Sequence, residues 1–103
     1  MIDYIYEVEE IKKQLIEYYK PEKIILFGSV ARNEVTENSD IDLLLIKMTD
    51  KSFTERIREA HQGLKYRIPL DIIVYTENEI KKLSSSSFFI RDIIEKGIIL
   101  YEQ

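Results

Sequence analysis

The sequence contains no cysteine, no tryptophan and a single histidine, His61. Without cysteine the chain has no disulfide, no thiolate metal site and no cysteine nucleophile, and one histidine excludes a multi-histidine metal centre. No apolar run approaches the roughly 20 residues that span a bilayer, and Met1 to Tyr4 lacks the basic and apolar segments of a signal peptide. These absences predict a cytoplasmic protein.

An excess of positive charge is missing as well, since the formal net charge is −4 at neutral pH. Domains that grip nucleic acid through its phosphates are usually basic, so direct nucleic-acid binding is not expected. An acidic small-molecule substrate is compatible with this charge if a bound cation reverses the local field. The 103 residues are 45% hydrophobic and 33% charged, which predicts one soluble globular domain over residues 1–103.

Hydrophobic periodicity predicts alternating helices and strands along the chain. The longer helices are expected at residues 3–19 and 52–67, the second with Ser52 as N-cap and Glu55 in a capping-box position. Shorter helices are expected at residues 29–34, from 77 onward and at 88–96, with Ser84 to Ser87 as a loop. Short apolar runs predict strands at residues 23–27, 41–46, 70–75 and 98–101. This order predicts an α/β fold, a small mixed β-sheet flanked by helices.

Three aspartates occupy strand starts, where apolar residues are expected. Asp40 and Asp42 are two residues apart and therefore face the same side of their strand. Asp71 begins the next strand. The connections predict that strand 41–46 runs antiparallel to strand 23–27 and parallel to strand 70–75. All three carboxylates should then converge on one rim of the sheet, together with Gly28 and Ser29.

Converging carboxylates repel one another and take up protons unless a cation lies among them. Ligands that are all oxygen favour Mg²⁺ or Mn²⁺, with a substrate phosphate completing the shell. Gly28 permits close approach of a ligand, and Ser29 is expected to cap a helix whose free N–H groups favour phosphate. Arg32, one turn further on, can pair with phosphate oxygens. Metal and phosphate sites side by side are what two-metal phosphoryl or nucleotidyl transfer requires.

These residues resemble a known family. Gly28-Ser29, ten further residues and Asp40-Ile41-Asp42 resemble the G-S-x10-D-x-D signature of the DNA polymerase β nucleotidyltransferase superfamily. The fuller strings, residues 27–32 and 39–43, are closer still to its minimal nucleotidyltransferases, which include the antitoxins paired with HEPN-domain toxins. The resemblance continues through Asp71 to residues 97–102 and covers nearly the whole chain.

The resemblance implies a polymerase β palm-like fold and transfer of AMP from ATP to a protein hydroxyl, with a tyrosine of a partner HEPN toxin as the expected acceptor. It implies that Asp40 and Asp42 bind two Mg²⁺ or Mn²⁺ ions. Asp71 would bind the catalytic metal and help to deprotonate the acceptor, while Gly28 and Ser29 would hold the triphosphate. Larger members of the superfamily add a helical domain, so acceptor recognition is expected to come from the partner protein.

Other interpretations stay open. The protein can instead be a binding module that neutralises a toxin by contact, with nucleotide binding serving structure or regulation. A third possibility is an enzyme that modifies a small molecule such as an aminoglycoside. Arg32 can form a surface salt bridge with Glu34 or Glu37 instead of binding phosphate. Residues 18–19 and 88–89, two pairs of adjacent aromatics, can pack in the core or mark a partner surface. Asn33 departs from the glycine that many relatives carry, and asparagine tolerates the same left-handed backbone.

Overall fold

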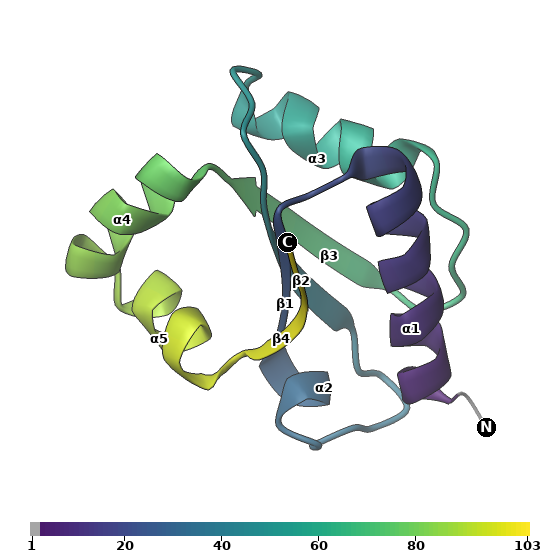
Figure 1. The fold of residues 1–103 in the computed structure, drawn as a ribbon. Coiled ribbons are helices and arrows are strands. Elements are labelled where there is room, and N and C mark those ends of the chain that lie inside the picture. Colours follow the sequence, from purple (N-terminus) through teal and green to yellow (C-terminus); the bar gives the residue numbers. More distant parts are fainter. Residues whose placement is uncertain (1–2) are drawn as a thin grey trace.

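The computed structural model describes residues 3–103 and shows one four-stranded sheet with helices on both faces (Figure 1). Met1 and Ile2, which entered the interpretation of the N-terminus, lie outside the described residues. The strand order is β3-β2-β1-β4, and the four strands are β1 (Lys23–Phe27), β2 (Ile41–Ile46), β3 (Leu70–Tyr75) and β4 (Ile98–Glu102). Strand β2 pairs antiparallel with β1 and parallel with β3, as predicted. The predicted mixed α/β fold is therefore confirmed.

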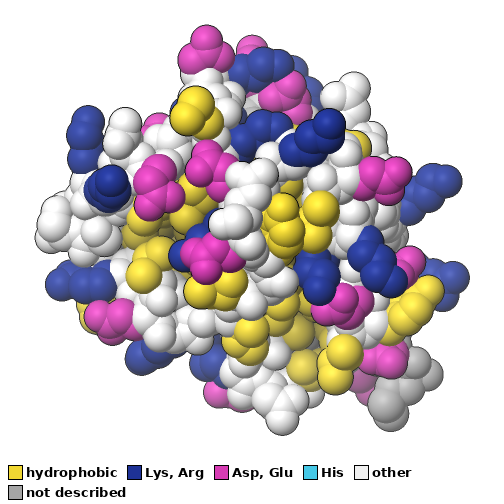
Figure 2. All heavy atoms as spheres, viewed as in Figure 1, with side chains coloured by type: hydrophobic (Ala, Val, Ile, Leu, Met, Phe, Trp, Pro, Cys, Tyr) yellow, Lys and Arg dark blue, Asp and Glu magenta, His cyan; other side chains and the backbone are white. Residues whose placement is uncertain are grey.

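The helices follow the predicted order along the chain. They are α1 (Tyr4–Gln14), a turn of π-helix η1 (Leu15–Tyr19), α2 (Gly28–Ala31), α3 (Phe53–Gln62), α4 (Glu77–Ser86) and α5 (Phe88–Lys96). None of the helices described here has the length and apolar composition needed to cross a membrane. Figure 2 shows acidic and basic side chains interspersed over the face in view, without one continuous basic patch on it.

Several predicted bounds differ from the structure: α2 ends at Ala31 and not at residue 34, and β4 extends to Glu102. Two larger differences have a local cause. Helix α3 ends at Gln62 instead of Arg67, because the side chain of Gln14 binds both backbone groups of Lys65 and holds that segment outside a helix. The predicted loop at Ser84 to Ser87 is mostly helix. Ser84 and its two successors lie in α4, where their hydroxyls donate to carbonyls one turn earlier. Only Ser87 leaves the helix, as the N-cap of α5.

The π-helical turn decides which of two adjacent tyrosines is buried. The amide of Lys20 donates to the carbonyl of Leu15 at 2.9 Å, a bond that closes over five residues and not four. The extra residue rotates Tyr19 into the core at 5% exposure and leaves Tyr18 at 37%. A regular helical period through Val8, Ile11 and Leu15 would place Tyr18 inside. Its hydroxyl instead donates to the carbonyl of Ala60 and ties η1 to α3.

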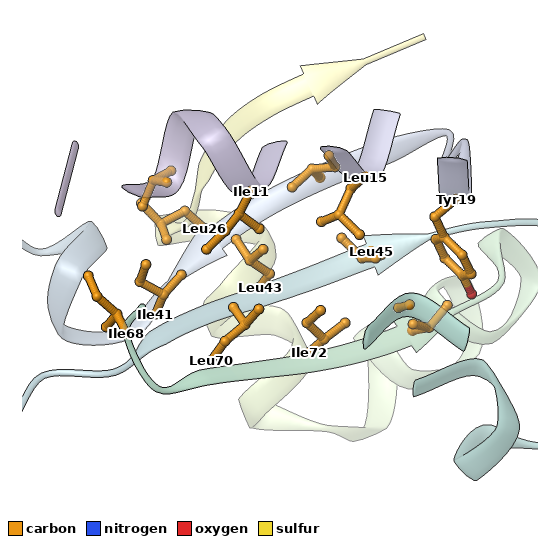
Figure 3. Packing of buried hydrophobic residues seen from close by; sticks show 14 residues of the cluster. Ile11, Leu15, Tyr19, Leu26, Ile41, Leu43, Leu45, Ile68, Leu70 and Ile72 are labelled. Carbon is orange, nitrogen blue, oxygen red and sulfur yellow. The ribbon is translucent and has the colours of Figure 1, made fainter. Parts of the chain in front are cut away.

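Strand residues alternate between two hydrophobic clusters, one on each face of the sheet. Leu43 and Leu45 of β2 face α1, η1 and α3, and Figure 3 shows Ile11 and Leu15 lying over them. Leu44 and the residues that alternate with it face α4 and α5 in a smaller cluster formed by Ile25, Leu44, Ile46, Ile80, Ile90 and Ile93. Because side chains two apart share a face, the aspartates of β2 and β3 belong to the face that α4 and α5 cover.

Candidate active site

The turn from β1 into α2 requires glycine for two reasons. Gly28 has a φ of +79°, a left-handed conformation that side chains other than glycine adopt at a cost. A Cβ atom at this position would lie 2.2 Å from Oδ2 of Asp42, closer than any real contact. The group that lies close to Gly28 is the Asp42 carboxylate, and the approach of a ligand to this glycine stays a prediction.

Pairing across the sheet brings the predicted rim together. Phe27 is opposite Asp42 in the β1–β2 register, and Asp42 is opposite Asp71 in the β2–β3 register. Asp42 is half-buried and Asp71 is exposed. Asp40 precedes β2 by one residue and lies close enough to act on Asp42 electrostatically. The convergence of Gly28 with the aspartates is thus what the connections predicted.

The environment of Asp42 opposes its negative charge. Burial raises the pKa of Asp42 most, the charges of Asp71 and then Asp40 raise it further, and a hydrogen bond to Asp71 adds to the shift, which brings the pKa to about 6. The positive charge of Arg32 acts in the opposite direction. A carboxylate held in such surroundings is stabilised by a proton or by a cation.

The carboxylates of Asp40, Asp42 and Asp71 have the right chemistry for a divalent cation, but their positions fit one only in part. Asp42 and Asp71 lie within hydrogen-bonding reach of each other, and they offer the oxygen ligands that Mg²⁺ and Mn²⁺ prefer. Within residues 3–103, no group of three acidic, histidine or cysteine side chains stands in an arrangement that could hold a metal ion. The three aspartates therefore form a metal site only if their side chains move closer together.

A network that starts in α1 fixes the approach to β2. The hydroxyl of Tyr4 donates to the carbonyls of Ser39 at 3.1 Å and Thr36 at 3.2 Å. The buried Ser39 side chain in turn accepts from the amide of Thr36 at 2.8 Å. At the next residues, the amide of Ile41 donates to the carbonyl of Pro69 at 2.9 Å and aligns the starts of β2 and β3. The sequence interpretation missed this role of Tyr4, since only the fold brings α1 beside this loop.

The predicted phosphate-binding residues lie at the same turn, with one correction. Ser29 is not the N-cap of α2: Phe27 occupies that position without a side-chain bond, and Ser29 is inside the helix. Arg32 forms the surface ion pair with Glu34 that the sequence allowed, at 3.3 Å. Its charge nevertheless acts on Asp42, so the guanidinium lies near the acidic rim. Asn33 has a φ of 58°, the left-handed backbone expected there.

A pocket of about 210 Å³ adjoins Gly28 on the side of α5. Its lining comes from the β1–α2 turn and from one face of α5, and consists of Phe27, Gly28, Ala31, Arg32, Phe89, Asp92, Ile93, Lys96 and Gly97. The rings of Phe27 and Phe89 meet edge to face, with centroids 5.8 Å apart and planes at 84°. Phe88, the other half of the aromatic pair in the sequence, does not line this pocket.

Comparison with known proteins identifies the family of the chain. Residues 9–103 match the polymerase beta nucleotidyltransferase family, and the chain belongs to that family. It is therefore an enzyme of the nucleotidyltransferase class.

Individual proteins of known sequence or structure are also similar to this chain. Three proteins of Methanocaldococcus jannaschii, each provisionally named a protein adenylyltransferase, are similar to this chain. One is 39% identical over 79 residues, which are 77% of each chain. The others are 40% and 51% identical over 78 residues, which are 72% of this chain and 79% of theirs. A crystal structure of a provisionally named nucleotidyltransferase from Sulfolobus solfataricus has the same fold, with a TM-score of 0.57 at 21% identity over 95% of this chain and 76% of that one.

Proposed function

We propose that this nucleotidyltransferase transfers AMP from ATP to a hydroxyl group of a partner protein. The observation that carries the proposal is the juxtaposition of Gly28, Asp42 and Asp71 on one rim, where a glycine turn adjoins converging carboxylates. The names of the M. jannaschii relatives support a protein as acceptor. The finer proposal is that the acceptor is a tyrosine of a HEPN-domain toxin and that the protein acts as its antitoxin.

Each residue of the rim has a role in this reaction. Asp40, Asp42 and Asp71 would hold two divalent cations, Mg²⁺ or Mn²⁺, which supply Lewis-acid activation of the α-phosphate and charge stabilisation of the leaving pyrophosphate. Asp71, the exposed one of the three aspartates, accepts the proton of the acceptor hydroxyl. The hydroxyl oxygen then bonds to the α-phosphorus as the bond between this phosphorus and pyrophosphate breaks.

The substrate phosphates are held beside these carboxylates. Gly28 lets a phosphate approach its backbone, because no Cβ stands in the way. The hydroxyl of Ser29 does not cap helix α2, so it can donate to a phosphate oxygen. The guanidinium of Arg32 exchanges its exposed partner Glu34 for phosphate oxygens, a stronger charge-assisted pair.

One observation favours a second function, neutralisation of a partner by contact alone. In the described part of the chain, the three aspartates do not stand in an arrangement that holds a metal ion. A protein whose three aspartates never gathered around a cation would bind its partner without modifying it. Toxin neutralisation by an Asp40→Ala, Asp42→Ala double variant would support this function over transfer.

The direct test of transfer uses α-³²P-ATP, Mg²⁺ and a HEPN-domain partner, with label on protein as the readout. We expect label with the wild type and a loss of more than about 100-fold in Asp42→Ala, equivalent to roughly 2.7 kcal/mol of transition-state stabilisation. Glu95→Gln, at an exposed position of α5 outside the rim and the neighbouring pocket, should still transfer label. Full activity in both Asp40→Ala and Asp42→Ala would refute the site assignment.

Cation binding can be tested without any activity. At Mg²⁺ or Mn²⁺ ten times above the dissociation constant, the wild type should gain about 1.4 kcal/mol in free energy of unfolding. This gain corresponds to a rise of several degrees in the thermal midpoint. Asp42→Ala should show no rise, because it removes a ligand. An equal rise in both proteins would place the cation elsewhere.

A further inference from the structure

The pocket between α2 and α5 shares a wall with the acidic rim. Gly28 lines the pocket and also touches the carboxylate of Asp42, so the two sites meet at this residue. A nucleotide whose phosphates lie at Gly28 therefore has its nucleoside within reach of the pocket. Ala31 and Gly97, both small residues, keep the interior open, and Arg32 and Lys96 bring positive charge to its edge.

The aromatic wall of the pocket is suited to a flat ring. Phe89 is 54% exposed although it is a large apolar residue, and it is fixed by the edge-to-face contact with Phe27. This contact covers at most one face of the Phe89 ring, and the exposure of the side chain leaves the other face for stacking. Nucleobases stack on such rings with little dependence on base identity, since every base has a π-face.

The polar wall is suited to a ribose. Asp92 and Lys96 follow Phe89 at intervals of three and four residues, so the three side chains lie on one face of α5. Asp92 and Lys96 form an ion pair at 3.2 Å, and the half-buried carboxylate retains further acceptor capacity. A carboxylate that lines the same pocket as a phosphate-binding turn can accept from ribose hydroxyls, as one does in dinucleotide-binding proteins.

We propose that this pocket binds the nucleoside of the donor nucleotide, with the base stacked on Phe89 and the ribose hydroxyls bound to Asp92. The inference rests on the proposed function and adds the specificity of the same site. Stacking on a phenylalanine discriminates poorly among bases, whereas a carboxylate on the ribose rejects nucleotides that lack hydroxyl groups. The protein therefore selects ribonucleotides more strongly than it selects adenine.

The experiment compares two adjacent phenylalanines by calorimetric binding in Mg²⁺, without any acceptor protein. Phe89→Ala should weaken ATP binding about 10-fold and leave the binding of inorganic tripolyphosphate unchanged. Phe88→Ala is the matched control: Phe88 is 76% exposed and lies outside the pocket, so neither ligand should be affected. ATP binding that is equal in wild type and Phe89→Ala overturns the proposal.

The ribose contact has its own pair of variants. Wild type should bind ATP about 10-fold more tightly than 2′,3′-dideoxy-ATP, and Asp92→Asn should reduce this preference, because the amide is a weaker acceptor. Glu95→Gln, at an exposed position of the same helix, should keep the full preference for ATP over the dideoxynucleotide. A preference that survives in Asp92→Asn at its full size overturns the assignment of Asp92.

The remaining outcomes separate this inference from the proposed function. If the wild type binds ATP no better than tripolyphosphate, the nucleoside makes no contact and the pocket assignment fails, while the phosphate site stands. If Phe89→Ala loses transfer to the partner but binds ATP normally, Phe89 contacts the acceptor and the pocket assignment fails. If the wild type binds neither ligand, the proposed function fails and the inference fails with it.

Discussion

The two faces of the sheet differ in what they bury. Under α1, η1 and α3, the inward residues of β2 are Ile41, Leu43 and Leu45, all at most 1% exposed and all apolar. Under α4 and α5, the alternating residues begin with Asp42 and become apolar only at Leu44. The first face holds the strands in register, which lets the second keep repelling carboxylates at its rim. Stability and chemistry are thus divided between the faces.

Adjacent leucines of β2 provide the largest test of this division. Leu43→Ala should lower the free energy of unfolding by about 4 kcal/mol and Leu44→Ala by about 3 kcal/mol, within the range of buried leucine truncations. The difference is expected because the larger cluster is enclosed and cannot collapse around the cavity, whereas α4 and α5 form a smaller layer. Urea unfolding of both variants measures it. An equal or larger loss in Leu44→Ala would contradict the comparison.

Gly28→Ala should cost about 2 kcal/mol of stability, since the left-handed backbone alone costs roughly 1–2 kcal/mol and the new Cβ also displaces the Asp42 carboxylate. The same change in an Asp42→Ala background should cost less, because the carboxylate is then gone. Chemical denaturation of the four proteins in this cycle gives the coupling energy. Strict additivity would show that the contact between Gly28 and Asp42 carries no strain.

Asp42→Asn should stabilise the fold by about 1 kcal/mol at pH 7 in chelator. The raised pKa of Asp42 means that the folded state binds its proton more tightly than the unfolded state, whose pKa is near the ordinary 3.8. The wild type therefore loses stability as the pH rises from about 4 to about 6, and the figure of about 1 kcal/mol is discounted because the group is half exposed. Thermal unfolding from pH 4 to pH 7 should show the two proteins converging at low pH. A wild type as stable as the variant at pH 7 would contradict this prediction.

The smallest effect on stability is expected at Arg32. Its ion pair with Glu34 is exposed on both sides, so Arg32→Ala should change the free energy of unfolding by less than about 0.5 kcal/mol. The same variant should weaken ATP binding if the guanidinium binds phosphate. Glu34→Ala, which removes only the surface partner, should leave ATP affinity unchanged or raise it. Equal ATP affinity in wild type and Arg32→Ala would show that Arg32 forms only the surface ion pair with Glu34 and does not bind phosphate.

Sequence patterns were sufficient to predict the strands of the sheet and the residues that converge on its rim. The bounds of β1, β2 and β3 were predicted to the residue, because each is apolar apart from one charged residue and lies between polar or turn-forming residues. The convergence of Gly28, Asp42 and Asp71 followed from the lengths of the connections, which leave few ways to join these strands.

The parts that escaped prediction depend on contacts between distant residues. Gln14 ends α3 through the backbone of Lys65, and Tyr4 anchors the loop before β2, each across more than thirty positions. The pocket likewise needs α5 folded back on the β1–α2 turn, so that Phe89 reaches Phe27. No local pattern in the sequence encodes such a pairing. The loop predicted at Ser84 to Ser87 was wrong because a polar run is typical of loops, although serine hydroxyls can also hydrogen-bond to carbonyls within a helix.

The contact between Gly28 and the Asp42 carboxylate also bears on how descendants of this protein can change. Any residue larger than glycine at position 28 meets the acid, so the glycine is constrained for as long as Asp42 remains. A lineage that abandons catalysis should lose the acid first, because only the loss of Asp42 removes the steric part of the constraint on the glycine. The left-handed backbone at position 28 then remains as the weaker reason to keep glycine, so the geometry sets the order in which the two residues can change.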